Sequence, residues 1–252
     1  MLVCRWSKAT EYKSRFWRQT AFQVSMAVCL MFVVLTAIAM LFYPGGTTAD
    51  PEAPRYLFFQ NFFSDLGLTE AKSGEINTVS AVLFIIALSL AGGILALFFT
   101  AFAQFFGGSF RGKLVSRLGA VAGVISGICF VGIAATPANL HGWAHGVFVD
   151  WAFRMFLLAA LLYTAAILIE RQYPKQMAIV FAMFALLLAA YVVLITIGPS
   201  TETDNGLTIQ ATGQKIIVYA AIVAIFIQAW AALRFARSGA AMPGAKPVEI
   251  VG

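Results

Sequence analysis

The sequence predicts an all-α polytopic membrane protein, a bundle of six transmembrane helices with both termini in the cytoplasm. Two observations carry the fold class. Only 11% of the 252 residues are charged, against roughly 25% in an ordinary soluble domain, and 61% are hydrophobic. The apolar residues also come in blocks of about 20, the length that crosses ~30 Å of hydrocarbon. Together these features exclude a water-soluble monomer.

Each apolar block is expected to be a helix, because backbone groups in lipid must be paired within the segment and no block alternates as a barrel strand does. Glycines at Gly92–Gly93 and at Gly119, Gly123 and Gly127 either mark faces where helices approach closely or belong to loosely packed helices. The spans are predicted over residues 21–43, 77–102, 114–135, 145–169, 177–198 and 214–233, within a transmembrane domain covering 21–236.

The distribution of basic residues predicts the orientation. Thirteen Lys and Arg residues lie in the N-terminal arm, the second and fourth connections and the tail, whereas only Arg55, Lys72 and Lys215 fall on the other side. The positive-inside rule therefore places both termini in the cytoplasm and the connection 44–76 outside. A prokaryotic plasma membrane fits this pattern. The chain's +6 charge is accounted for by topology, so no nucleic-acid partner is expected.

The two ends of the chain are expected to be simple. The arm 1–20 interleaves aromatic and basic residues, which is typical of an amphipathic helix on anionic lipid headgroups. The tail 237–252 contains Gly and Pro residues and is expected to be disordered. The three cysteines show no disulfide or zinc-finger spacing.

The external loop 44–76 is the first candidate functional region. It begins with Pro-Gly-Gly and continues with an aromatic stretch, 55–67, that is too short to cross the membrane. At helical spacing Asn61, Ser64 and Asp65 share one face. The stretch either dips into the bundle with this polar face or is an aromatic anchor at the interface that ends at Gly67.

The two histidines form the second candidate region, at the outer end of the fourth span. His141 and His145 are four residues apart, so on a regular helix they share a face and offer two nitrogens to one metal ion. A zinc site needs a third protein ligand, for which Asp65 and Asn77 are better candidates than Glu75 or Asp150. Three interpretations stay open: interfacial residues bonded to carbonyls or headgroups, a polar network with the external loop, and a metal site.

The spans contain few other ionisable or catalytic residues. Asp150 lies four residues before Arg154, a spacing that predicts an ion pair. With no other ionisable residue at mid-depth, the spans argue against a proton-driven pump. The sequence also has no phosphate-binding loop, no His-Glu-x-x-His and no Gly-x-Ser-x-Gly elbow.

Three short motifs resemble a family of six-span prokaryotic membrane proteins known as the domain-of-unknown-function 998 family. They are Tyr-Pro-Gly-Gly followed by Asn-Phe-Phe-Ser-Asp-Leu-Gly at 61–67, Leu-His-Gly-Trp-Ala-His at 140–145, and Asn-Gly-Leu-Thr-Ile-Gln at 205–210. The resemblance implies a six-helix fold without an established activity and singles out Ser64, Asp65, His141 and His145.

Two looser similarities suggest lipid-related work. The chain is similar to the Frag1/DRAM/Sfk1 group of six-span proteins, which implies a lipid-linked or regulatory role. It is also distantly similar to membrane ceramidase-like hydrolases, which hold zinc with a His-x-x-x-His pair. It departs from those hydrolases by having six spans, no third histidine, and Ser64 directly beside Asp65.

Three functions are therefore considered. The sequence does not decide whether the protein is an enzyme, and it does not decide whether the protein forms a homo-oligomer. The first is a non-enzymatic protein whose outer polar pocket binds lipid headgroups. The second is a zinc-dependent lipid hydrolase with His141, His145 and Asp65 as ligands and Ser64 orienting the substrate or water. The third is a small transporter, which the apolar spans disfavour. The headgroup pocket would comprise Asn61, Ser64, Asp65, Asn77, His141 and His145.

Overall fold

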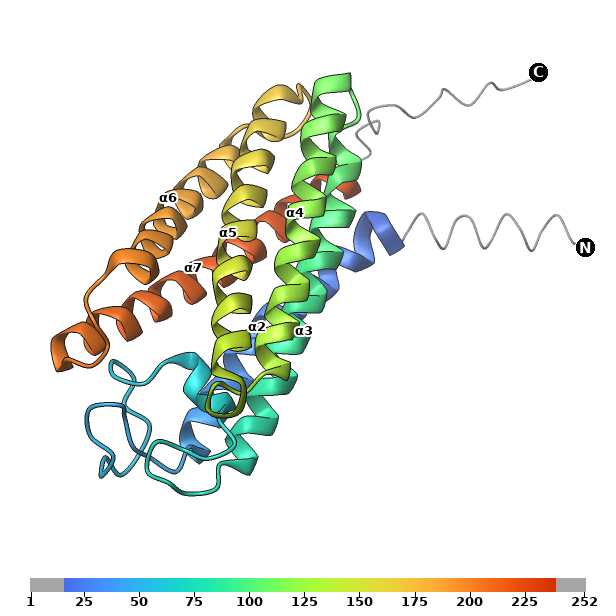
Figure 1. The fold of residues 1–252 in the computed structure, drawn as a ribbon. Helices are drawn as coiled ribbons and strands as arrows, with labels where there is room; N and C mark the ends of the chain where they lie inside the picture. The colour runs from blue at the N-terminus through green and yellow to red at the C-terminus, as the bar shows by residue number, and fades with distance from the viewer. Residues whose placement is uncertain (1–15, 239–252) are drawn as a thin grey trace, which may run out of the picture.

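The computed structural model describes residues 16–238, and within them the chain is a bundle of six long helices with no β-strand (Figure 1). All six are long and apolar enough to span a membrane, which confirms the predicted fold class. The basic arm before residue 16 and the tail after residue 238 lie outside the described residues. The helices are α2 (Ala21–Phe42), α3 (Thr78–Phe102), α4 (Phe110–Ala135), α5 (Ala138–Ile169), α6 (Gln176–Ile197) and α7 (Asp204–Arg237).

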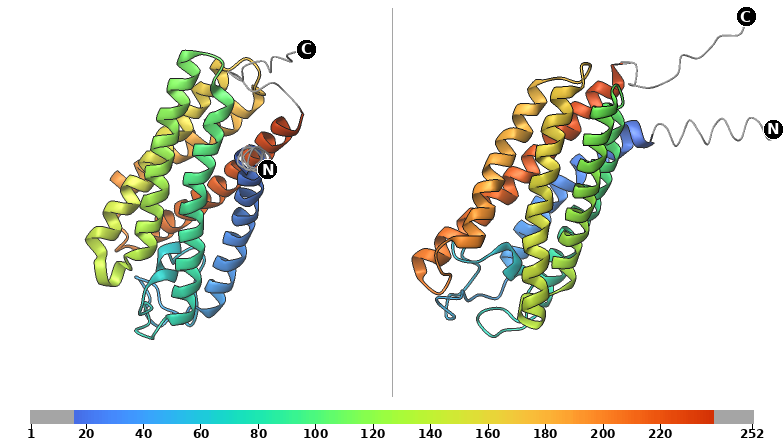
Figure 2. Two further views of the ribbon diagram at one scale, coloured as in Figure 1. Left: turned by 90° about the vertical axis from the view of Figure 1, so that its right-hand side faces the viewer. Right: turned by 45° about the horizontal axis from the view of Figure 1, so that its top comes forward.

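The helices form a ring. Each packs against its neighbours in the chain, and α7 returns to pack against α2. Three short elements complete the fold: a π-helical turn η1 (Phe16–Thr20) before α2, and the 3-10 turns η2 (Phe63–Gly67) and η3 (Ala103–Phe106). The segment 43–77, which contains η2, covers one end of the ring, called the loop end below; the other is called the opposite end (Figure 2).

Two helices are longer than their apolar spans. The fourth predicted span begins at residue 145, but α5 begins at Ala138; the sixth begins at 214, but α7 begins at Asp204. The Thr203 hydroxyl caps α7 by accepting a hydrogen bond from the Gly206 N–H at 3.2 Å. Hydropathy missed these turns because polar residues can continue a helix beyond the hydrocarbon, where packing and capping support it.

Glycines bring α3 and α4 into direct backbone contact. A Cβ atom on Gly92 would lie 2.5 Å from the Gly127 carbonyl oxygen, and one on Gly127 would lie 2.4 Å from the Gly92 oxygen. A Cβ on Gly123 would meet the ring of Phe99. Gly92, Gly123 and Gly127 thus form a close-packing face between α3 and α4, as one of the two sequence interpretations holds, whereas Gly119 packs against Tyr163 of α5 and Gly93 faces open space.

Aromatic side chains close the opposite end of the ring. The Phe102 ring is fully buried, stacks on Phe98 with 5.2 Å between ring centroids, and contacts Tyr163 and Tyr173. Further buried rings extend this cluster between α2, α3, η3, α5 and α6. They belong to Phe22, Phe99, Phe105, Phe106 and Phe181. The opposite end is therefore held mainly by apolar packing.

Candidate functional site

The external loop is folded tightly against the bundle. Gly45 and Gly46 have φ angles of 135° and 79°, which side-chain-bearing residues rarely adopt, and a Cβ at either would collide with loop backbone. The Gly46 N–H donates to the Ala53 carbonyl at 2.8 Å, and the Ser73 N–H to the Gly45 carbonyl at 3.1 Å. The Pro-Gly-Gly motif thus allows the two arms of the loop to meet.

Asn61 is the hub of the loop and is fully buried. Its Nδ2 donates to the Gly46 carbonyl at 2.9 Å and to Asp65 Oδ2 at 3.1 Å. Its Oδ1 accepts from the Leu57 N–H at 2.9 Å. One side chain therefore joins three parts of the loop.

Asp65 lies in η2 and is also buried, with Oδ2 accepting from the Phe62 N–H at 2.8 Å in addition to Asn61. Burial raises the pKa of this carboxyl above its usual value. The charges of Lys72 and Lys215 and the two hydrogen bonds oppose the shift without cancelling it. Ser64, its neighbour, is half-buried on the same turn.

Lys215 of α7 reaches into the loop with only 2% of its surface exposed. Its Nζ donates a hydrogen bond to the Asn61 carbonyl oxygen. The ammonium lies 5.1–5.3 Å from the ring centroids of Tyr56, Phe58 and Phe63, within the range of cation–π attraction. An aromatic cage from the loop therefore surrounds a cation from the last helix.

The residue before Lys215 makes a second connection between α7 and the loop. Gln214 Oε1 accepts from the Phe63 N–H at 2.7 Å. On the other side of η2, Asn77 Nδ2 donates to the carbonyls of Leu66 and Leu68 at 3.0 and 2.8 Å, and the Ser80 hydroxyl donates to Leu66 at 3.1 Å. The turn η2 is thus fastened to α7 and to the start of α3.

The two histidines do not act together. His141 has φ −134° and ψ 44°, which interrupts the helical path of α5, so the two imidazoles do not follow the common face that regular spacing predicts. His141 is exposed, whereas His145 is buried with Nδ1 2.7 Å from the Thr136 carbonyl oxygen. The bond from α5 to the loop comes instead from Asn139, whose Nδ2 donates to the Thr69 hydroxyl at 2.8 Å.

The predicted metal ligands are consequently not assembled. Across residues 16–238, no group of three or more His, Cys, Asp or Glu side chains is placed to hold a metal ion. Asp65 is engaged with Asn61 and the loop backbone, and His145 is directed at the turn before α5. The geometric basis of the zinc hypothesis, two histidines on one regular helix face, is therefore absent.

The six predicted pocket residues fall into separate places. Asn61 and Asp65 are joined by a hydrogen bond, Ser64 lies beside them, and Asn77 supports the same turn from the start of α3. The histidines lie apart from them in α5, where His145 contacts the Thr136 carbonyl before the helix. The predicted ion pair between Asp150 and Arg154 is present. Sequence reasoning missed Lys215, Gln214 and Tyr56. The only signal was a lysine at the edge of an apolar span, which was counted as an ordinary outer base.

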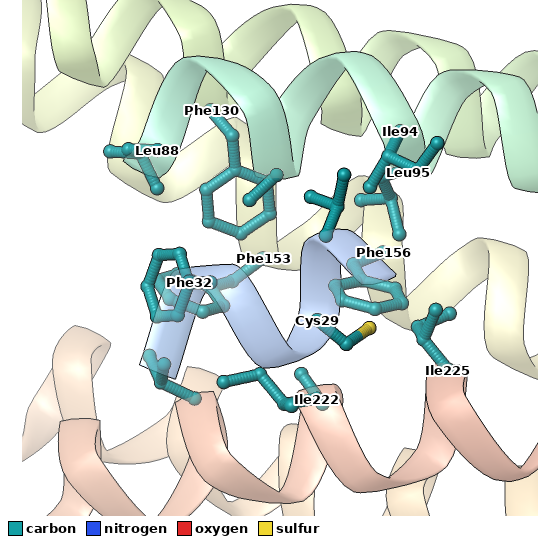
Figure 3. Close-up of a pocket in the computed structure, with 14 residues that line it drawn as sticks. Cys29, Phe32, Leu88, Ile94, Leu95, Phe130, Phe153, Phe156, Ile222 and Ile225 are labelled. Atoms are coloured by element: carbon teal, nitrogen blue, oxygen red, sulfur yellow. The ribbon is translucent and has the colours of Figure 1, made fainter. Parts of the chain in front are cut away.

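A cavity of about 100 Å³, partly open to its surroundings, lies among the helices of the ring (Figure 3). Its walls are almost wholly apolar, and the labelled side chains from several helices point toward the same space. Five helices contribute to it. The lining residues are Val28, Cys29 and Phe32 of α2; Leu88, Ala91, Ile94 and Leu95 of α3; Phe130 of α4; Phe153 and Phe156 of α5; and Val218, Ala221, Ile222 and Ile225 of α7.

The cavity and the loop meet at Phe63. Its ring centroid is 6.1 Å from that of Phe32, a cavity residue, and 5.7 Å from that of Tyr219. The same ring lies beneath the Lys215 ammonium, and Lys215 is about one helical turn from the cavity residue Val218. The buried charge of Lys215, the Phe63 ring of the loop and the apolar cavity therefore lie next to one another beside α7.

The class that the fold defines is an integral membrane protein with six spanning helices and a folded loop over residues 43–77. No protein-family model, curated protein or solved structure matches this chain. The resemblances given by the short sequence motifs therefore stay predictions, and function has to be argued from the cavity and the loop.

Proposed function

We propose that this protein binds a lipid-like molecule, holding an apolar segment of the ligand in the interior cavity beneath the external loop. The observation that carries the proposal is the apolar lining of the ~100 Å³ space. Apolar walls of this kind favour an apolar guest over water. The space in this protein suits the end of a hydrocarbon chain and is too small for a whole two-chain lipid.

The loop acts in this proposal as the cover of the cavity and not as an open headgroup pocket. Asn61 donates to the Gly46 carbonyl and to Asp65 Oδ2, Asn77 donates to two loop carbonyls, and Asp65 accepts two hydrogen bonds from within the loop. These groups fix Phe63 above Phe32. Asn61, Asp65 and Asn77 therefore position the cover, whereas the cavity beneath it contacts the ligand.

The charge distribution supports an orientation with the loop outside. Basic side chains, among them Arg111, Lys113, Arg117, Arg171 and Arg237, lie at the opposite end of the ring. By the positive-inside rule this end faces the cytoplasm, in the plasma membrane of a prokaryote. The ligand would then be a molecule that reaches the protein from the outer leaflet or the outer aqueous side. No specific observation favours the hydrolase or the transporter.

The test is native mass spectrometry of protein purified in a mild detergent, which detects lipid-like molecules that stay bound. The cavity-filling change Ala221→Phe places a ring in the space. The matched control is Val223→Phe, which adds a ring to a lipid-facing position of the same helix. We expect bound molecules on the wild type and the control, and their loss from Ala221→Phe.

Two further measurements separate a loss of binding from a loss of folding and report on access to the cavity. Thermal melting identifies a variant that is merely unfolded, in which case Ala91→Leu supplies a milder filling of the same space from α3. Apolar maleimides report on access to Cys29, whose thiol lines the cavity, with Cys29→Ala as the blank. Equal binding by folded wild-type and cavity-filled protein would refute the proposal.

A further inference from the structure

The Lys215 ammonium is buried without an ion-pair partner. It has three N–H donors, and one is used on the Asn61 carbonyl. Among residues 16–238 the single ion pair is that of Asp150 and Arg154, so no described carboxylate lies within 4 Å of Lys215. A buried charge is costly unless it is paired, and intramembrane charges are usually kept for function.

The neighbouring ionisable groups do not fill this place. The charge of Asp65 acts on Lys215, but Asp65 Oδ2 is engaged by Asn61 and the Phe62 N–H. The other groups facing the ammonium are the aromatic rings of its cage, of which only Tyr56 is titratable, and burial raises its pKa well above the usual value. The Lys215 ammonium therefore has N–H donors that remain available to an added anion.

The position of this cation defines what kind of anion fits. About one turn of α7 separates Lys215 from Val218 at the cavity, and Phe63 lies against both the ammonium and Phe32. A ligand spanning both places needs an anionic head and an apolar tail. A single ammonium matches a singly charged head, and the ~100 Å³ cavity admits one narrow chain.

We infer that the ligand is a single-chain amphiphile with a carboxylate head, such as a long-chain fatty acid, whose head pairs with Lys215 while its tail enters the apolar cavity. This inference rests on the proposed function and names its ligand class. The Phe63 ring lies where the head would join the tail, so binding displaces this ring and loosens the Gln214 bond to its backbone.

The experiment compares three probes with the same tail and different heads: palmitate, hexadecanol and hexadecyltrimethylammonium. Native mass spectrometry measures their binding to the wild type and to Lys215→Met, Lys215→Arg and Lys72→Met, the last an exposed lysine of the same loop. Each probe is compared between variants and not with the other probes, so its partition into detergent micelles affects all variants equally. We expect Lys215→Met to lose about tenfold or more in palmitate binding, the scale of a charged hydrogen bond, with hexadecanol unchanged. Lys215→Arg and Lys72→Met should retain palmitate.

A measurement on the wild type covers the case in which Lys215→Met does not fold. Palmitate labelled with ¹³C at its carboxyl is titrated by NMR, and pairing with an ammonium should keep the bound carboxylate ionised to lower pH than in micelles. Bound palmitate that titrates as in micelles, or a folded Lys215→Met that binds it as tightly as the wild type, overturns the inference. If the inference fails but Ala221→Phe still blocks hexadecanol binding, the proposed function survives. If Ala221→Phe blocks the binding of neither palmitate nor hexadecanol, the inference and the proposed function are both overturned.

Discussion

At the loop end of the bundle the segment 43–77 is held by hydrogen bonds between buried polar groups, whereas at the opposite end the helices are closed by packed aromatic rings. Asn61 illustrates the first kind of contact and Phe102 the second. Hydrogen bonds fix direction and register, so losing one releases a local segment. Ring packing adds many weak contacts among several helices, so losing one weakens the whole bundle. A lost contact is therefore expected to act locally at the loop end and on the whole bundle at the opposite end.

The largest effect is expected from breaking the aromatic end. Phe102→Ala removes a fully buried ring that touches Phe98, Tyr163 and Tyr173, and should lower the free energy of unfolding by about 3 kcal/mol or more, through the lost contacts and the cavity left behind. Denaturation in an SDS titration measures this change. Phe110→Ala, at an 81% exposed position of the same end, is the control and should change little. Equal losses in the two variants would contradict the description of this end as a packed core.

A smaller and local effect is expected at the hub of the loop. Asn61→Ala removes the side-chain bonds to Gly46, Leu57 and Asp65 and should cost about 2 kcal/mol, because buried partners are left unsatisfied. Hydrogen exchange should rise across 43–77 and stay unchanged in the aromatic end. Gln60→Ala, the neighbouring amide, serves as the control. Exchange that rises equally at both ends would show that the loop and the bundle unfold as one unit.

The smallest effect is expected from pH, through Asp65. Burial raises its folded-state pKa above the ordinary value of 3.8, so the folded protein binds the proton more tightly than the unfolded chain does. The stabilisation is fully present below that value and is lost as pH rises through the folded pKa. Between pH 4 and 7 the wild type should therefore lose melting temperature relative to Asp65→Asn, which does not titrate there.

The opposite trend would contradict the assignment for Asp65. A wild type that gains stability over Asp65→Asn as pH rises would mean that the attraction of Lys72 and Lys215 outweighs burial. Such a result would also give Lys215 a charged partner in the loop and would weaken the case for an added carboxylate.

The sequence indicated which loop residues lie together better than it indicated their geometry. Asn61 and Asp65 were expected to act together, and they are joined by a hydrogen bond, but through a 3-10 turn and not along a regular helix. The histidines do not keep the expected common face, because the backbone at His141 departs from regular helix geometry. Lys215 was grouped with exposed bases because its aromatic cage comes from a segment about 150 residues earlier, as its bond to Asn61 shows.

By itself the sequence determined the number of spanning helices and their approximate positions, because the length and hydropathy needed to cross hydrocarbon are local properties of each segment. It also indicated the glycine face where α3 meets α4. Only the tertiary structure decided that the cation of α7 lies inside the loop, that Phe63 covers Phe32, and that five helices leave an apolar space between them. These features depend on packing and hydrogen bonding between side chains that are far apart in the sequence. A local sequence pattern does not contain that information.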